Sequence, residues 1–277
     1  TTAWSMIFGM LAVLFIGFSF YHKWKLPYPK DDQTLSDPKS PEIKNIFSTL
    51  LSLASGSILS ILKSVILNRF FLSYFQKPQI ALSIVFILLY RFGEAQLVKI
   101  APLFMLDPLE AGGLGLSTSQ YGFIYGTLGV IMLTLGGITG GFFAARHGLK
   151  SWIIWMALAM KLPDLVYVYM AYAQPDNYYL ISTFVAIEQF GYGFGFTAYL
   201  LFMMMISEGE HKTAHYAICT GLMALGMMLP GMFSGALQES IGYQHFFNWV
   251  MVATIPGLIM IKFIKIDPQF GINKDNS

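Results

Sequence analysis

Seven stretches of the chain are apolar over a length that suits a membrane-spanning helix. A helix needs about 20 mainly apolar residues to cross the hydrocarbon core of a bilayer. The stretches cover approximately residues 3–21, 79–105, 119–145, 151–173, 178–207, 214–237 and 245–264. This pattern predicts an all-α integral membrane protein.

A long polar connection separates the first two stretches. Residues 23–44 are rich in Pro, Lys and Asp, as solvated linkers are. Residues 43–76 have apolar positions at helical spacing, with Ser, Thr and Gly on the other face. We interpret this part as one or two amphipathic helices on the membrane surface. A spanning helix is the alternative, and the placement of charges decides between them.

Lysine and arginine are distributed asymmetrically around the stretches. Basic residues that flank short loops stay on the cytoplasmic side of a membrane. If the connection is cytoplasmic, 14 of the 17 basic residues lie on the inner side, and the other three lie inside predicted helices. The outer loops then hold no Lys or Arg. A spanning connection would turn later basic residues outward, so we exclude it. The predicted order is a spanning helix (1–22), a cytoplasmic linker (23–78), a six-helix bundle (79–266) and a cytoplasmic tail (267–277).

Composition narrows the classes of function. Charged residues make up 12% of the chain, about half the share of a typical soluble domain, and hydrophobic residues make up 55%. The net charge of +2 does not indicate a nucleic-acid partner. The single cysteine, Cys219, cannot form an internal disulfide or a thiolate metal cage. The chain begins with Thr1 rather than Met, which we interpret as a sign that it is part of a longer protein.

Five ionisable residues lie deep inside the predicted spanning helices. With a rise of about 1.5 Å per residue, all of them fall near the middle of the bilayer. Such residues usually face a cavity, and transporters place substrate and ion sites at this depth. We therefore predict that a substrate or proton pathway is formed by Arg91, Glu94, Lys161, Asp164 and Glu188 together with Gln189.

The spacing of these charges leaves two interpretations open. Arg91 and Glu94 have i,i+3 spacing, as do Lys161 and Asp164, so each pair shares a helix face and could form an internal ion pair. Glu188 has no basic residue within a helical turn. It must pair across helices or stay protonated, because burial disfavours the charged form. We take it as the best candidate for a proton carrier, with structural hydrogen bonding as the alternative.

Glycine and proline patterns indicate sites of helix packing or gating. Gly136 and Gly140 have the small-xxx-small spacing that lets helices approach closely. Alternate glycines do not share a helix face, so the run Gly191, Gly193 and Gly195 indicates a weakened helix that suits gating or cavity lining. Pro230 lies inside a spanning stretch, where neighbouring helices can satisfy the freed backbone.

Enzyme signatures are weak in this sequence. His211 and His215 have a metal-like i,i+4 spacing but lack the intervening Glu of a zinc protease, and no phosphate loop or nucleophile elbow is present. We predict no catalytic residue, no metal and no cofactor. The alternatives are a polytopic membrane enzyme with a metal site at its inner face, and a scaffold membrane protein.

From Tyr90 onward the chain resembles the AmpG-type muropeptide permeases, a branch of the major facilitator superfamily. The resemblance rests on motifs at residues 90–94, 122–126, 188–193, 213–217, 230–231 and 242–247. Residues 141–150 resemble the inner-loop signature of the superfamily, although Ala145 replaces its usual acidic residue.

This resemblance implies a fold of twelve helices in two halves. The chain would hold helix six, the inner linker and the six-helix C-terminal half. The implied function is proton-coupled transport by alternating access in the bacterial inner membrane, possibly of a muropeptide-like solute. The implied partners are the lipid bilayer, a small polar solute, protons and the N-terminal half of the same protein.

Overall fold

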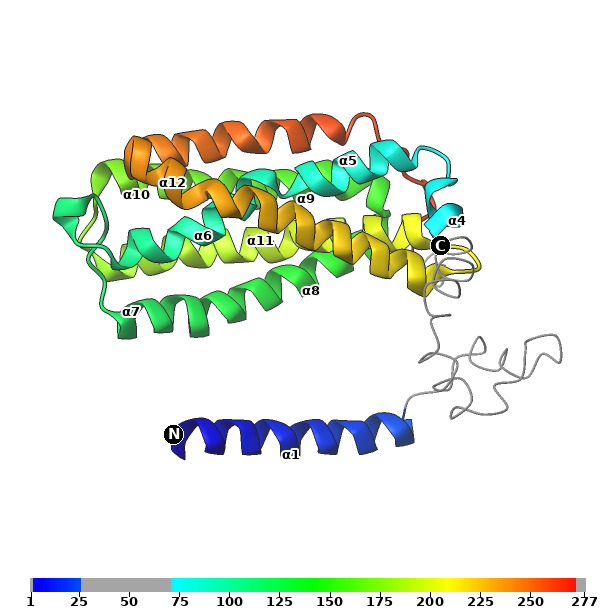
Figure 1. The fold of residues 1–277 in the computed structure, drawn as a ribbon, viewed down its shortest axis with the longest axis horizontal. Helices are drawn as coiled ribbons and strands as arrows, with labels where there is room; N and C mark the ends of the chain where they lie inside the picture. Colours follow the sequence, from blue (N-terminus) through cyan, green and yellow to red (C-terminus); the bar gives the residue numbers. More distant parts are fainter. Residues whose placement is uncertain (1, 26–70, 273–277) are drawn as a thin grey trace, which may run out of the picture. The chain divides into compact units, whose positions relative to one another are not determined.

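The computed structural model describes residues 2–25 and 71–272, and every regular element in these two ranges is a helix (Figure 1). The predicted all-α membrane fold is confirmed. Helix α1 covers Thr2–Lys25 and belongs to a separate unit of the chain. The apolar stretch found among its described residues is Ala12–His22. A spanning helix over residues 1–22 stays a prediction.

Most of the predicted linker lies outside the described residues, including residues 43–70 of the amphipathic segment. What is described at its end is a single short helix, α4 (Leu72–Phe75), whose Tyr74 side chain is fully buried. The remaining helices follow from residue 80 onward.

Five segments of the described chain are long and apolar enough to cross a membrane. Their starts and ends agree with the predicted stretches to within a few residues, except at the C-terminal end. They consist of α5 (Ile80–Tyr90) with α6 (Phe92–Leu106); α7 (Thr118–Phe123), the π-helix η4 (Ile124–Gly129) and α8 (Val130–His147); α9 (Leu149–Lys161), the 3-10 turn η5 (Leu162–Asp164) and α10 (Leu165–Ala173); α11 (Tyr178–Ser207); and α12 (Lys212–Met260).

Helix α12 is two helices joined at a sharp bend. Its 49 residues would span about 73 Å if straight, more than twice the hydrocarbon thickness of a bilayer. At Gly242 the backbone turns to φ 75° and ψ 166°, a conformation that favours glycine. The chain doubles back there, as Figure 1 shows. The two parts correspond to the last two predicted stretches.

Helix α11 packs between α8 and α9, and its alternate glycines make both contacts. A Cβ at Gly193 would lie 2.0 Å from the Leu133 carbonyl oxygen of α8, and one at Gly191 would lie 2.0 Å from the Ala159 carbonyl oxygen of α9. Residues two apart on a helix point in nearly opposite directions, so these glycines allow close contact with α8 on one side and with α9 on the other. Helix α11 is continuous over 30 residues, and a gating role of this run stays a prediction.

The other glycines of the predicted packing set also lie against backbone. A Cβ would lie 2.0 Å from Phe190 O at Gly136, 2.8 Å from Phe194 O at Gly140, and 2.4 Å from Met156 O at Gly195. Pro230 lies within the first part of α12, where its carbonyl oxygen accepts a 3.0 Å hydrogen bond from Ser234 Oγ.

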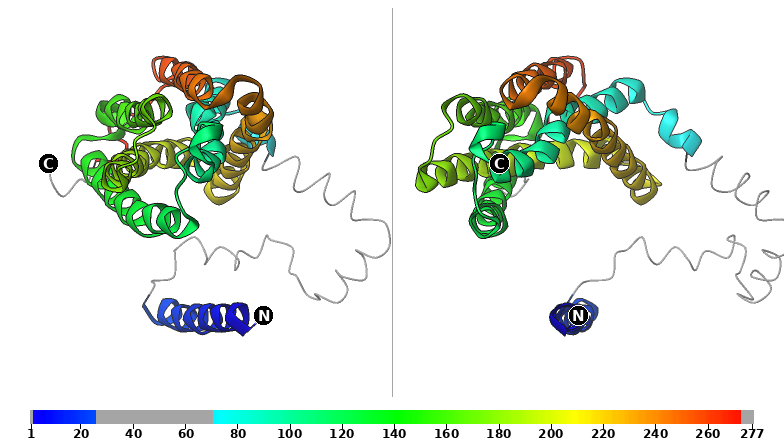
Figure 2. Two further views of the ribbon diagram at one scale, coloured as in Figure 1. Left: turned by 90° about the vertical axis from the view of Figure 1, so that its left-hand side faces the viewer. Right: turned by 60° about the vertical axis from the view of Figure 1, so that its left-hand side comes forward.

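Three turns at one end of the bundle are tied together. The Tyr243 hydroxyl donates a 2.5 Å hydrogen bond to Asp107 Oδ2, which joins the bend of α12 to the end of α6. Gln174 Nε2, at the end of α10, donates to the carbonyl oxygens of Leu109 and Gly113, each at 3.0 Å. The helices from α5 to α12 run along a common direction between this end and the other (Figure 2).

Candidate functional site

Two spanning segments are interrupted where the sequence places its buried charges. Helix α5 ends at Tyr90, Arg91 adopts φ −107° and ψ 15°, and α6 begins at Phe92. Helix α9 ends at Lys161, and the 3-10 turn that follows contains Pro163, which cannot donate a backbone hydrogen bond. The predicted i,i+3 pairs therefore do not lie on continuous helices, because each pair straddles a break.

The four charges match the dipoles of the helix ends that these breaks create. Arg91 follows the last residue of α5, and Lys161 is the last residue of α9. Glu94 lies in the first turn of α6, and Asp164 precedes α10 as its N-cap. Cations are favoured at helix C-termini and anions at N-termini, so each charge stabilises the end where it lies.

These four residues form one buried cluster, which we call the charge quartet. Arg91 is 7% exposed, Glu94 3%, and Lys161 and Asp164 1% each. Lys161 interacts electrostatically with the other three, and Glu94 interacts with both Arg91 and Asp164. Lys161 Nζ and both carboxylate oxygens of Asp164 nevertheless have no hydrogen-bond partner among the described residues.

The two cations of the quartet lie against aromatic rings. Lys161 Nζ is 5.4 Å from the centroid of the Tyr90 ring. The Arg91 guanidinium lies 4.8 Å from the centroid of Phe196 and donates a hydrogen bond to the Tyr192 hydroxyl. These contacts offset part of the cost of burying charge.

A cavity of about 290 Å³ lies beside the charge quartet, and its mostly apolar surface carries several polar groups. It is enclosed by α6, the α7–η4–α8 segment, α10 and α11. Its apolar lining includes Leu97 and Leu133, and its polar lining consists of Glu94, Glu188, Gln189 and four tyrosines, Tyr121, Tyr125, Tyr167 and Tyr192. Arg91, Lys161 and Asp164 do not line it, so the predicted pathway residues divide into a cavity set and an adjacent set.

Glu188 is held by hydrogen bonds from neutral groups. Gln189 Nε2 donates to Glu188 Oε2 at 3.0 Å, and the Tyr167 hydroxyl donates to the same oxygen at 3.4 Å. The Tyr125 and Tyr167 hydroxyls are hydrogen-bonded to each other. We expected only one of Glu188 and Gln189 to face the cavity, but both line it because the Gln189 amide lies beside its neighbour's carboxyl.

Sequence reasoning missed the four tyrosines of the cavity. Tyr121 and Tyr125 have i,i+4 spacing, and their ring centroids lie 5.1 Å apart, so this spacing was the available signal. The π-helix η4, which begins at Ile124, changes the direction in which later side chains point, and nothing in the hydrophobic pattern indicated it.

Within the described part of the chain, the histidine pair at the other end of the bundle belongs to no group of side chains that could hold a metal ion. His211 and His215 have ring centroids 6.1 Å apart, and His215 Nε2 lies 3.0 Å from Ser73 Oγ. The described ranges contain no group of three or more His, Cys, Asp or Glu side chains placed to hold a metal ion. The alternative of a membrane enzyme with an inner-face metal site gains no support.

The fold and the buried polar groups define a polytopic helical membrane protein. No protein-family model matches the chain. It is 25% identical over 203 residues to AmpG 1 of Rickettsia felis, covering 73% of this chain and 43% of that protein. It is 23% identical over 225 residues to AmpG 1 of Rickettsia prowazekii (80% and 48%), and 22% identical over 203 residues to the anhydromuropeptide permease of Escherichia coli K12 (73% and 40%).

These matches confirm the similarity to AmpG-type permeases that the sequence motifs indicated. The chain spans about half the length of the curated relatives it matches. The names of these relatives describe transporters and a permease rather than enzymes, in agreement with the predicted class.

Proposed function

We propose that this chain is one part of a proton-coupled secondary transporter, in which the cavity beside the charge quartet binds a solute during alternating access. The observation that supports this most directly is the cavity itself, with Glu94, Glu188 and Gln189 on the walls of apolar spanning helices. Ionisable groups at such a depth are costly and are typical of ion and substrate pathways.

The interrupted helices support the same function. Transporters commonly form their sites where spanning helices break, because free helix ends supply charge-stabilising dipoles next to the cavity. Here α5–α6 and α9–α10 break beside the cavity, and the charge quartet occupies the four resulting ends.

We propose that the solute is muropeptide-like, as the name of the Escherichia coli relative suggests. Four tyrosines and one glutamine give the cavity flat rings with hydroxyl and amide groups, which suit a sugar–peptide. A volume of about 290 Å³ is at the small end for an organic ligand. The rest of the site would come from a second helical bundle of the same protein in the bacterial inner membrane.

Glu188 is the proposed proton carrier, and a full-length transporter containing this chain tests it. Glu188→Gln keeps the shape and removes titration, while Glu239→Gln changes an exposed carboxyl as the matched control. In proteoliposomes we expect Glu188→Gln to lose accumulation driven by a pH gradient and to keep solute exchange without a gradient. Normal accumulation by Glu188→Gln would exclude this role, and loss of exchange as well would indicate a binding role instead.

A further inference from the structure

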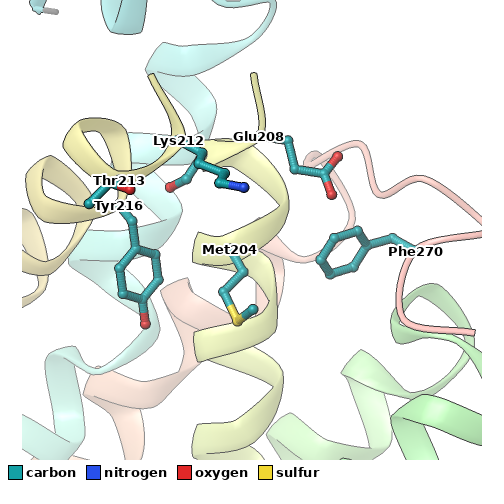
Figure 3. Close-up of a pocket in the computed structure, with 7 residues that line it drawn as sticks. Met204, Glu208, Lys212, Thr213, Tyr216 and Phe270 are labelled. Atoms are coloured by element: carbon teal, nitrogen blue, oxygen red, sulfur yellow. The ribbon is translucent and has the colours of Figure 1, made fainter. Parts of the chain in front are cut away.

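A second cavity, of about 470 Å³, lies where α11 ends and α12 begins. Figure 3 shows its lining side chains, which come from one continuous stretch, residues 204–216, and from Phe270. Met204 and Ser207 belong to α11, Glu208 to the turn, Lys212, Thr213 and Tyr216 to α12, and Phe270 to the segment after α12.

The lining is apolar on its walls and charged at one end. Tyr216 and Phe270 flank Met204 from opposite sides, and Glu208 and Lys212 both lie toward the same end of the cavity (Figure 3). An amphiphilic molecule with a polar head and an apolar chain matches such a lining.

The wall formed by Phe270 is fixed rather than loosely placed. The Phe270 carbonyl oxygen accepts a 3.1 Å hydrogen bond from Leu149 N, at the turn between α8 and α9. Gly148 in this turn has φ 80°, and a Cβ there would lie 3.1 Å from Ile272 Cγ1. The segment after α12, which carries Phe270, therefore packs closely on the α8–α9 turn.

The position of the cavity points to a membrane lipid. It lies at the ends of two spanning helices, which is the level of lipid headgroups. Its charged end carries one carboxylate and one ammonium, so a headgroup with both charges matches it better than an anionic one. Lys77 does not line this cavity; its Nζ donates to the backbone oxygens of Ile206 and Glu208 at 2.6 and 2.7 Å, and its charge also acts on Glu208.

We propose that this cavity binds a zwitterionic phospholipid whose headgroup carries a primary ammonium. The phosphate lies at Lys212 and Thr213, the ammonium donates hydrogen bonds to Glu208, and an acyl chain follows Met204, Tyr216 and Phe270. A quaternary ammonium has no N–H to donate, and a glycerol headgroup brings no cation, so neither lipid type can form the charge-assisted N–H hydrogen bond to Glu208.

Native mass spectrometry of the purified chain in a nonionic detergent tests this proposal. The probes are dioleoyl phosphatidylethanolamine, phosphatidylcholine and phosphatidylglycerol, which share acyl chains and differ in headgroup. We expect phosphatidylethanolamine to bind roughly threefold to fivefold more tightly than the other two lipids. This ratio of affinities corresponds to the free energy of about one exposed charge interaction. Glu208→Gln should abolish this preference, and Lys212→Gln should weaken binding of all three lipids.

Two matched variants complete the experiment. Glu210→Gln changes an exposed carboxyl in the same turn, and Lys262→Gln changes an exposed ammonium beyond the end of α12; both lie outside the cavity lining. Neither should alter lipid binding. Equal binding of the three lipids, a preference for phosphatidylglycerol, or the same loss in Glu210→Gln as in Glu208→Gln would overturn the proposal. Thermal unfolding of each variant verifies that the fold is retained.

Discussion

The Tyr167 hydroxyl lies 3.4 Å from Glu188 Oε2 and is also hydrogen-bonded to the Tyr125 hydroxyl. The carboxyl of Glu188 is therefore joined through two phenols to the far wall of the cavity. Tyr167 itself is only 1% exposed, so its hydroxyl is positioned by the surrounding packing. Glu188 itself lines the cavity, and this chain of hydroxyls extends its hydrogen bonding to Tyr125, another lining residue.

Removing the Tyr167 hydroxyl should slow transport without unfolding the protein. Tyr167→Phe keeps the ring but removes the donor to Glu188 and the partner of Tyr125. We expect uptake driven by a pH gradient in the full-length transporter to fall about tenfold, with thermal stability lowered by about 1 kcal/mol or less. Tyr169→Phe, at an exposed position on the same helix, is the control and should behave as wild type. Equal uptake by the two variants would remove the hydroxyl chain from the mechanism.

Alanine at the alternate glycines of α11 should destabilise the bundle. At Gly191 and Gly193 a Cβ would lie 2.0 Å from a carbonyl oxygen of α9 or α8, so the helices must separate. We expect each variant to lose about 1–3 kcal/mol of unfolding free energy, measured by detergent titration. Gly122→Ala and Gly141→Ala have open space around the new methyl group and should cost much less. A similar cost at all four positions would contradict the contact argument.

Lys161 and Asp164 should be coupled energetically. Removing one charge leaves the other buried in an unbalanced quartet, so Lys161→Met and Asp164→Leu should each destabilise the protein by about 3–5 kcal/mol. The double variant should lose less unfolding free energy than the two single variants together, because neither charge is left without the other. A double-mutant cycle measured by thermal or detergent unfolding gives the coupling energy, and additive losses would show that the two side chains are independent.

Labelling of introduced cysteines should establish the orientation. Charge asymmetry predicts that the α11–α12 turn lies inside and the α10–α11 turn outside. Glu210→Cys should react with a membrane-impermeant thiol reagent only from the cytoplasmic side, and Asp176→Cys only from the opposite side. Both positions are exposed, whereas native Cys219 is buried and should stay unlabelled. The reverse pattern of labelling would invert the predicted topology.

The sequence was sufficient to locate the spanning segments, because hydropathy over about 20 residues is imposed by the bilayer itself. It also indicated the buried charges, which are conspicuous in apolar helices. It did not indicate the helix break at Arg91, since no proline stands there and the break depends on packing of α5 and α6 against α12. The hydrogen bond between the Tyr125 and Tyr167 hydroxyls depends on the π-helix and joins residues 42 positions apart. Local periodicity does not encode such a contact.

Backbone contact at Gly191, Gly193 and Gly195 fixes the spacing of α8, α9 and α11 at its minimum. A larger side chain at any of these positions would push two helices apart, and there is no smaller residue than glycine. Substitutions during evolution can therefore hardly change the spacing of the helices in this part of the bundle. Adaptation to a different solute would have to proceed by exchanging side chains on the cavity walls, such as Tyr121 or Gln189, within an unchanged framework.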